Sequence, residues 1–164
     1  MSKEIERKWL IKPNYSYKNL IKTIERYVED KSDVIEDYYI NPNTRLRIKN
    51  GKPYLTIKDI GFLERDEYEF PLTEEQINVF KDIQENQFLK KTRYYCNYKK
   101  QTFEYNVFWD LKQGRQPLII VELEIDNIDK KIDLPEHIGE EITFNSQYYG
   151  YKLFEKLMQK NMSN

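Results

Sequence analysis

The 164-residue sequence contains one cysteine, Cys96, and one histidine, His137. A single cysteine excludes an internal disulfide, so we expect Cys96 to be an ordinary packing or surface thiol in a reducing cytoplasm. A single histidine excludes a multi-histidine metal site and argues against histidine-based catalysis. Any chemistry that the chain performs must therefore rest on other side chains.

Long apolar runs and an excess of charge of one sign are also absent. No apolar stretch approaches the roughly 18 residues that a membrane-spanning helix needs, and the opening MSKEIERK lacks the apolar core of a signal peptide. Lysine and arginine total 27 and the acids total 28, which gives a formal net charge of -1. We expect no membrane partner and no nucleic-acid partner, and any preference for phosphate must come from local arrangement.

The length and composition fit one domain that spans residues 1–164. A 39% hydrophobic fraction is enough for one modest core, and no linker or repeat divides the chain. Ser16 can cap a helix over residues 17–30, and Thr73 begins a capping box before a second helix. A third helix is predicted to begin near Ser146.

Most of the remaining chain alternates charged and bulky residues, which is typical of β-strands. Asn50-Gly51 indicates a hairpin because both residues tolerate positive φ, and Gln113-Gly114-Arg115 marks a second hairpin. Short connections of this kind favour antiparallel pairing. The predicted strands cover approximately residues 2–11, 34–40, 44–50, 53–58, 65–71, 88–98, 102–111, 117–126 and 130–134.

The most informative segment is Glu4-Ile5-Glu6-Arg7-Lys8-Trp9-Leu10. Successive side chains on a strand alternate faces, so Glu4, Glu6 and Lys8 share one face. An ordinary half-exposed sheet would show the same alternation. Here, however, acids and bases are sorted onto different strands, which solubility does not require.

This sorting of charge favours a closed or strongly curved antiparallel sheet of about eight strands, with its charged faces turned inward. The interior would have to be wet and its charges compensated, because burying many charges in a dry interior costs several kcal/mol each. The apolar strand faces would then turn outward and pack under helices. We therefore predict an α+β barrel with a polar, charged interior.

The acids and bases suggest complementary roles. Carboxylates two strand steps apart, about 7 Å at the backbone, can converge on one magnesium or manganese ion. Arginine and lysine at the same depth would neutralise a polyphosphate, with arginine offering bidentate contacts. A site that combines metal-binding acids with phosphate-binding bases indicates phosphoryl transfer on a free polyanion.

The ordered series of charged motifs resembles the CYTH proteins, also called triphosphate tunnel metalloenzymes. The resemblance covers nearly the whole chain and implies a closed, antiparallel eight-stranded β-tunnel with helices packed outside. The matching segments are Glu4-x-Glu6-x-Lys8, Arg45-x-Arg47, Leu55-Thr56-Ile57-Lys58, Arg65-x-Glu67-x-Glu69, Lys91-x-Arg93, Glu122-x-Glu124 and Gly139-Glu140-Glu141-Ile142-Thr143.

The resemblance also implies roles for individual residues. The positions that match metal ligands, for Mg²⁺ or Mn²⁺, are Glu4, Glu6, Glu122 and Glu124. The positions that match substrate-binding bases are Lys8, Arg45, Arg47, Lys58, Arg65, Lys91 and Arg93. Lys8 or Lys91 would also serve as a catalytic proton acceptor if desolvation among other cations lowers its pKa.

The expected function is metal-dependent hydrolysis of a triphosphate. Inorganic tripolyphosphate is the favoured substrate, because the short chain shows no pocket motif for an organic group. An adenylyl cyclase and a thiamine triphosphatase are alternatives within enzymes, and a non-catalytic polyphosphate or nucleotide sensor is the alternative of another class. An apolar outer strand face could also support a homodimer.

Three positions depart from the family pattern and leave the choice among these functions open. Asn106 stands where family strands often carry an aspartate, although Glu104 on the same face could compensate. Gln147 replaces a usual arginine, and Gly150 stands where the family commonly shows an asparagine.

Overall fold

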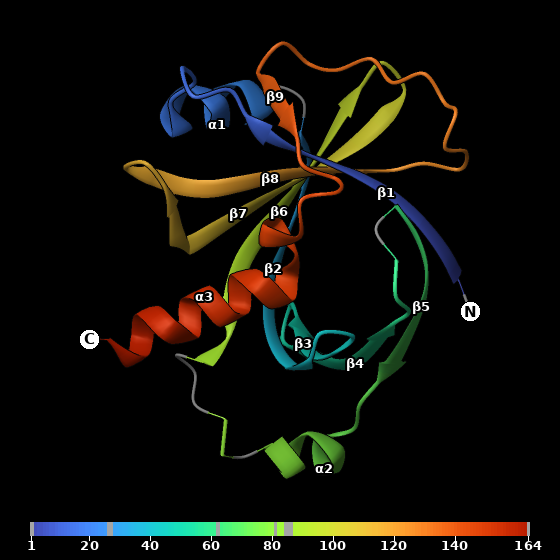
Figure 1. The fold of residues 1–164 in the computed structure, drawn as a ribbon, viewed down its shortest axis with the longest axis vertical. Helices are drawn as coiled ribbons and strands as arrows, with labels where there is room; N and C mark the ends of the chain where they lie inside the picture. Colours follow the sequence, from blue (N-terminus) through green and yellow to red (C-terminus); the bar gives the residue numbers. More distant parts are fainter. Residues whose placement is uncertain (1, 26–27, 62, 81, 84–86, 164) are drawn as a thin grey trace.

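The computed structural model describes residues 2–25, 28–61, 63–80, 82–83 and 87–163, and within them one continuous antiparallel sheet dominates. Its order is β5-β4-β3-β2-β6-β7-β8-β1-β9, and β5 also pairs with β1. Eight strands therefore close into a ring, which confirms the predicted barrel (Figure 1). The strands are β1 (Ser2–Ile11), β2 (Val28–Asn41), β3 (Thr44–Lys49), β4 (Lys52–Lys58), β5 (Glu64–Pro71), β6 (Leu89–Tyr98), β7 (Gln101–Gln113), β8 (Gln116–Glu124) and β9 (Ile138–Glu141).

The first strand, β1, closes the ring by pairing with three other strands. Residues 2–5 pair with β5, residues 6–10 pair with β8, and Trp9 and Ile11 pair with β9. Trp9 pairs with both β8 and β9, so these two strands lie on opposite edges of β1. β5 and β9 consequently share one edge, and only a short stretch of β1 seals the barrel against β5.

The apolar faces of β1, β6, β7 and β8 turn outward and form the main core. Trp9, Phe103, Tyr105 and Val121 are buried there together with Leu20 of α1 (Tyr17–Glu25). The hydroxyl of Ser16 accepts a hydrogen bond from the Asn19 backbone N–H, as expected for the predicted cap. Strand alternation therefore leaves the opposite, charged faces of these strands to line the lumen.

One end of the barrel is closed by α3 (Gly150–Met162). Leu153, Phe154 and Leu157 of this helix form one buried cluster with apolar side chains of the strands, namely Leu10, Leu89, Phe108, Leu118 and Ile120. Figure 1 shows α3 in red beneath the β7–β8 pair. The helix α2 (Glu74–Ile77) and two short 3₁₀ turns, η1 (Asn78–Phe80) and η3 (Ser146–Tyr148), complete the described helical segments.

Two predicted boundaries are wrong. The helix expected over residues 17–30 ends at Glu25, and β2 begins at Val28, while residues 26 and 27 lie outside the described part of the chain. Val28 pairs with Cys96 of β6, so long-range pairing overrides the local helical pattern. No helix in the described part of the chain has the length and apolar character required to cross a bilayer.

The strand expected over residues 130–134 is also wrong, because these residues have no regular structure and the last strand is β9. Asn127 begins a turn in which its side chain accepts from the Asp129 N–H and its carbonyl accepts from the Lys130 N–H. This local bonding takes the backbone out of the extended conformation just before the predicted strand. The free edge of β1 is paired by β9 instead.

Candidate functional site

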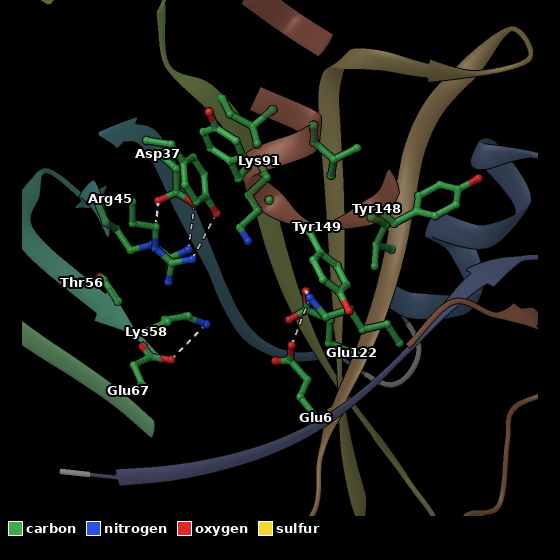
Figure 2. A pocket seen from close by; sticks show the side chains of 18 of the residues that line it. Glu6, Asp37, Arg45, Thr56, Lys58, Glu67, Lys91, Glu122, Tyr148 and Tyr149 are labelled. Atoms are coloured by element: carbon green, nitrogen blue, oxygen red, sulfur yellow. Dashed lines mark hydrogen bonds and ion pairs between the residues drawn. The ribbon is translucent and has the colours of Figure 1, made fainter. Parts of the chain in front are cut away.

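The inward strand faces enclose a cavity of about 410 Å³ lined mainly by charged side chains. Eight carboxylates and nine basic side chains face it, and they include every residue predicted to bind metal or substrate. In Figure 2, Arg45 and Lys58 lie on one side of this space, while Glu6 and Glu122 lie on the other. The closed sheet thus collects the charged faces of separate strands around one lumen.

Strand register places the acids of the lumen side by side. Lys8 of β1 lies opposite Glu122 of β8, and Glu122 lies opposite Glu104 of β7. Glu6 lies opposite Glu124 in the same β1–β8 ladder. Because opposed residues on one sheet face have Cβ atoms about 5 Å apart, long carboxylate side chains on these strands can meet.

Glu6, Glu104 and Glu122 form a compact acidic cluster. One carboxylate oxygen from each residue lies within 4.8 Å of the other two. Lys8 Nζ lies 3.2 Å from Glu6 and 3.6 Å from Glu122. Arg93 lies 3.5 Å from Glu104 and 3.6 Å from Glu122. Three converging oxygen donors form the kind of donor set that magnesium and manganese prefer.

Two carboxyl groups of this cluster, Glu104 and Glu122, have pKa values shifted in opposite directions. Burial raises the pKa of Glu104 to about 7, and the charges of Glu122 and Glu6 add to the effect. Burial also favours the neutral form of Glu122, but Lys8, Lys91 and Arg93 together hold its pKa well below the usual range. Near neutral pH, Glu104 therefore keeps a proton more readily than Glu122 does.

The other two predicted metal ligands, Glu4 and Glu124, lie outside this cluster. Glu4 is 3.1 Å from Lys58 Nζ and 3.6 Å from Arg65 Nε. Glu67 pairs with the same lysine at 3.0 Å. Glu124 lines the cavity, and partial burial beside other carboxylates raises its pKa. The structure thus brings together two of the four predicted ligands and adds Glu104 to them.

Asp37 organises the arginine side chains, and sequence reasoning missed it. Its carboxylate accepts two hydrogen bonds of 2.8 Å from Nε and Nη2 of Arg47, and it lies 3.8 Å from Arg45 Nε. Asp37 is only 1% exposed. Burial favours its neutral form, yet Arg47 and Arg45 keep the pKa of Asp37 far below the usual range. Asp37 lies in the strand predicted over residues 34–40, but nothing in that segment alone indicates its pairing with Arg47, which depends on the β2–β3 register.

Lys8 and Lys91, the two lysines predicted as proton acceptors, have opposite environments. Burial, Arg93 and Arg47 lower the pKa of Lys91 well below the usual range. Burial acts the same way on Lys8, but Glu6 and Glu122 overcome it and raise the pKa of Lys8. Figure 2 shows the Lys91 amine pointing into the cavity. A lowered pKa, which a lysine base needs, is found at Lys91 and not at Lys8.

The departure at Asn106 has a structural explanation. Asn106 is fully buried, and its side-chain oxygen accepts a 2.9 Å hydrogen bond from Arg93 Nε. Its side-chain nitrogen donates to the backbone carbonyl of Ile120 at 3.2 Å. An aspartate at this position would set a carboxylate oxygen against that carbonyl. Asparagine can accept a hydrogen bond from Arg93 and donate one to the Ile120 carbonyl, so it orients Arg93 without adding charge.

The departures near α3 differ in importance. Gly150 lines the cavity, and a Cβ at this position would overlap the hydroxyl of Tyr39. Glycine therefore makes room for Tyr39, whose hydroxyl accepts a 3.4 Å hydrogen bond from Arg45 Nη1. Gln147 is exposed and is not among the residues that line the cavity.

The barrel is closed and antiparallel, and its lumen holds an acidic cluster opposite a wall of basic side chains. These features define a class of protein that binds a polyanion inside a tunnel. The chain belongs to the CYTH domain family, whose model matches residues 2–157. This membership confirms the family that the charged motifs predicted.

Individual relatives extend this result along almost the whole chain. The sequence is 29% identical to an inorganic triphosphatase of Acetivibrio thermocellus, over 93% of this chain and 94% of that protein. It is 30% identical to an inorganic triphosphatase of Nitrosomonas europaea, over 88% and 92% respectively. A crystal structure of an inorganic triphosphatase, 26% identical, matches with a TM-score of 0.59 over 93% of this chain and 95% of that chain.

Proposed function

We propose that the protein hydrolyses inorganic tripolyphosphate to pyrophosphate and phosphate with the help of a divalent metal ion. The observation that supports this proposal is the acidic cluster of Glu6, Glu104 and Glu122 in the same cavity as Arg45 and Arg47. The two relatives named inorganic triphosphatase support the choice of substrate.

The acidic cluster fits a resident metal ion, because its three converging carboxylates supply the oxygen ligands that a hard divalent cation prefers. Glu6, Glu104 and Glu122 would hold Mg²⁺ or Mn²⁺, and Glu4 and Glu124 would add negative charge on the same side of the cavity. A bound ion would polarise phosphate oxygens and offset the charge that develops on them.

The bases of the cavity would bind and orient the substrate. Arginine and lysine side chains would contact phosphate oxygens and stabilise the negative charge that grows on the leaving pyrophosphate. Asp37, by holding Nε and Nη2 of Arg47, leaves the remaining nitrogen of this guanidinium for the substrate. The residues in this role are Lys8, Arg45, Arg47, Lys58, Arg65, Lys91 and Arg93.

Lys91 is the proton acceptor in this proposal. A water oxygen bonds to the terminal phosphorus while the bond from that phosphorus to the bridging oxygen breaks. The water proton passes to the neutral amine of Lys91, whose pKa burial and neighbouring arginines lower. Lys8, paired with Glu6 and Glu122, stays charged and serves as a phosphate ligand.

The test is to incubate the purified protein with tripolyphosphate, thiamine triphosphate or ATP and to measure phosphate, pyrophosphate and cyclic AMP. With Mg²⁺ or Mn²⁺, tripolyphosphate should yield equal amounts of phosphate and pyrophosphate, and EDTA should stop the reaction. Cyclic AMP and pyrophosphate from ATP would identify a cyclase instead. Tight tripolyphosphate binding without turnover under either metal would identify a sensor.

The acidic cluster is tested by a double variant, Glu6→Gln with Glu122→Gln. Loss of two of the three converging carboxylates should reduce metal-dependent turnover by about 100-fold or more, while the circular dichroism spectrum is retained. Glu75→Gln, at an exposed position on α2, is the matched control and should turn over at the normal rate. Unchanged turnover in the double variant would refute the metal assignment.

A further inference from the structure

Residues 139–143 lie beside β1 at the edge of the barrel wall, and none of these described residues lines the cavity. The Ile142 N–H donates to the Lys8 carbonyl at 2.8 Å, as in an antiparallel ladder. Continuation of that ladder would pair the Lys8 N–H with the Ile142 carbonyl. The Thr143 hydroxyl accepts from the Lys8 N–H instead, at 3.1 Å. A side chain outside the lumen therefore holds the backbone of a lysine that faces into it.

The direction of the Thr143 hydroxyl is set by a carboxylate. Thr143 is 1% exposed, and its hydroxyl donates to Glu141 Oε1 at 2.8 Å. Because a hydroxyl carries one hydrogen, this bond leaves its lone pairs for the Lys8 N–H. Glu141 in turn accepts two hydrogen bonds of 2.7 Å from Nε and Nη2 of Arg7, and such bidentate pairing restricts the carboxylate to one orientation. Arg7, Glu141 and Thr143 thus form a chain of hydrogen bonds that ends at Lys8.

A second route joins Thr143 to the charged end of Lys8. The Thr143 carbonyl accepts from the Tyr149 hydroxyl at 3.4 Å, and Lys8 Nζ lies 6.0 Å from the centre of the Tyr149 ring. The face of an aromatic ring attracts an ammonium group at about this distance. Thr143 therefore acts on the backbone of Lys8 directly and on its ammonium group through Tyr149.

We propose that Thr143 and Glu141 are positioning residues for Lys8, and that they set where its ammonium group meets the substrate. This inference rests on the proposed function, in which Lys8 is a phosphate ligand, and deepens it. A small displacement of a binding group can cost much of its effect even when the displaced contact lies away from the reacting atoms. The segment that holds Lys8 is therefore part of the substrate site without touching the substrate.

A double-mutant cycle tests whether Thr143 acts through Lys8. Thr143→Val keeps the side-chain volume but removes the acceptor for the Lys8 N–H, so it should weaken tripolyphosphate binding about 10-fold. In a Lys8→Gln background the same substitution should change the affinity by less than about 2-fold, since the ammonium group is already gone. The measurement is calorimetric titration with sodium tripolyphosphate in EDTA. An equal loss of affinity in both backgrounds is what a merely structural threonine predicts, and it would overturn the proposal.

Two further variants separate the hydroxyl from packing. Thr143→Ser keeps the hydroxyl and loses a buried methyl group, so it should have a lower melting temperature and yet bind tripolyphosphate as tightly as the native protein. Affinity that falls with the melting temperature in this variant would contradict the positioning role. Thr102→Val is the matched control, because it makes the same change at an exposed position of β7 whose hydroxyl donates to Asn97. It should leave the affinity unchanged.

Glu141→Ala keeps the proposal testable if Thr143→Val fails to fold. The Glu141 side chain is 36% exposed, and its removal frees the Thr143 hydroxyl to turn away from Lys8. Binding of tripolyphosphate should weaken about 3-fold in the native background and stay unchanged in the Lys8→Gln background. The same loss in both backgrounds would show that Glu141 does not act through Lys8.

The outcomes distinguish this inference from the proposed function. Normal turnover of tripolyphosphate by the native protein, with equal losses of affinity in both backgrounds, would refute the positioning role and leave the triphosphatase standing. Losses of affinity that require Lys8, without turnover by the native protein under Mg²⁺ or Mn²⁺, would support the positioning role and refute the triphosphatase.

Discussion

Asp37 shows how one buried carboxylate sets the geometry of a cationic site. It engages two nitrogens of Arg47 and approaches Arg45, so both guanidinium groups are held in fixed positions before any substrate enters. A buried ion pair is weak evidence for net stabilisation, but removal of one partner leaves an uncompensated charge. The main consequence of Asp37 is therefore the orientation of two arginines.

Replacement of Asp37 by asparagine should lower both stability and substrate affinity. Loss of the buried pair should cost about 3–5 kcal/mol of unfolding free energy, and the KM for tripolyphosphate should rise because Arg47 is no longer held. Tripolyphosphate should raise the melting temperature of Asp37→Asn less than that of the native protein, because a ligand that binds more weakly stabilises the folded state less. Equal shifts would contradict this explanation, and Asp126→Asn, at an exposed position, is the control.

Residues of the lumen differed in how well sequence could predict them. Every predicted metal or substrate residue lines the cavity, because the face on which a side chain lies depends only on alternation within its own strand. Which side chains of neighbouring strands meet depends on the register between those strands. The pairing of Asp37 with Arg47 follows from the β2–β3 register, and the grouping of Glu104 with Glu6 follows from two ladders through β8. Neither register could be read from local alternation.

At the scale of elements, the correct predictions were those supported by local chemistry. Thr73 and Gln76 form the expected capping box of α2, and Asn50 and Gly51 both have the positive φ values expected for their hairpin turn. The wrong predictions concern the start of β2 and the strand expected over residues 130–134, in place of which β9 forms; β2 and β9 pair with the distant strands β6 and β1. Such distant partners override local propensity, so neither the start of β2 nor the position of β9 could be predicted from its own residues.

Gly150 links α3 to β2 and gives a prediction for this junction. Alanine normally favours a helix over glycine, but in Gly150→Ala the new Cβ would overlap the Tyr39 hydroxyl. We expect a loss of about 1–3 kcal/mol in unfolding free energy from overpacking, measured by urea denaturation.

A second variant separates overpacking from other effects at the junction. Tyr39→Leu removes the hydroxyl and the ring that meet the added methyl group. The double variant should therefore be less destabilised than the sum of the two single variants. Strict additivity would show that Gly150 and Tyr39 do not interact in this way.

At the scale of the whole molecule, many ionisable groups share one enclosed lumen, and their pKa shifts couple stability to pH. The folded state raises the pKa of Glu104 from 4.5 to about 7, so folding favours its protonated form. This contribution is fully present below pH 4.5 and is lost as the pH rises toward 7. His137 acts in the opposite sense, because burial lowers its pKa from 6.5 and folding favours its neutral form.

The contribution of Glu104 can be isolated by comparison with Glu104→Gln in metal-free buffer. Between about pH 5 and pH 8, the native protein should lose stability relative to the variant, because only the native protein must ionise a buried carboxyl. Melting temperatures of both proteins across this range provide the measurement. His137 contributes equally to both curves, so a constant difference between them would exclude the raised pKa of Glu104.

The position of β1 has a consequence for how the chain folds. β1 precedes its partner strands β5, β8 and β9 in the chain, so the pairing of its residues 6–11 can form only after residues 120–124 and 138–141 have been synthesised. Such distant pairings slow folding and leave strand edges open to aggregation. During that wait, Glu4, Glu6 and Lys8 oppose wrong pairing, since charges on an open strand discourage edge-to-edge association. The same side chains that later line the lumen thus protect the nascent strand.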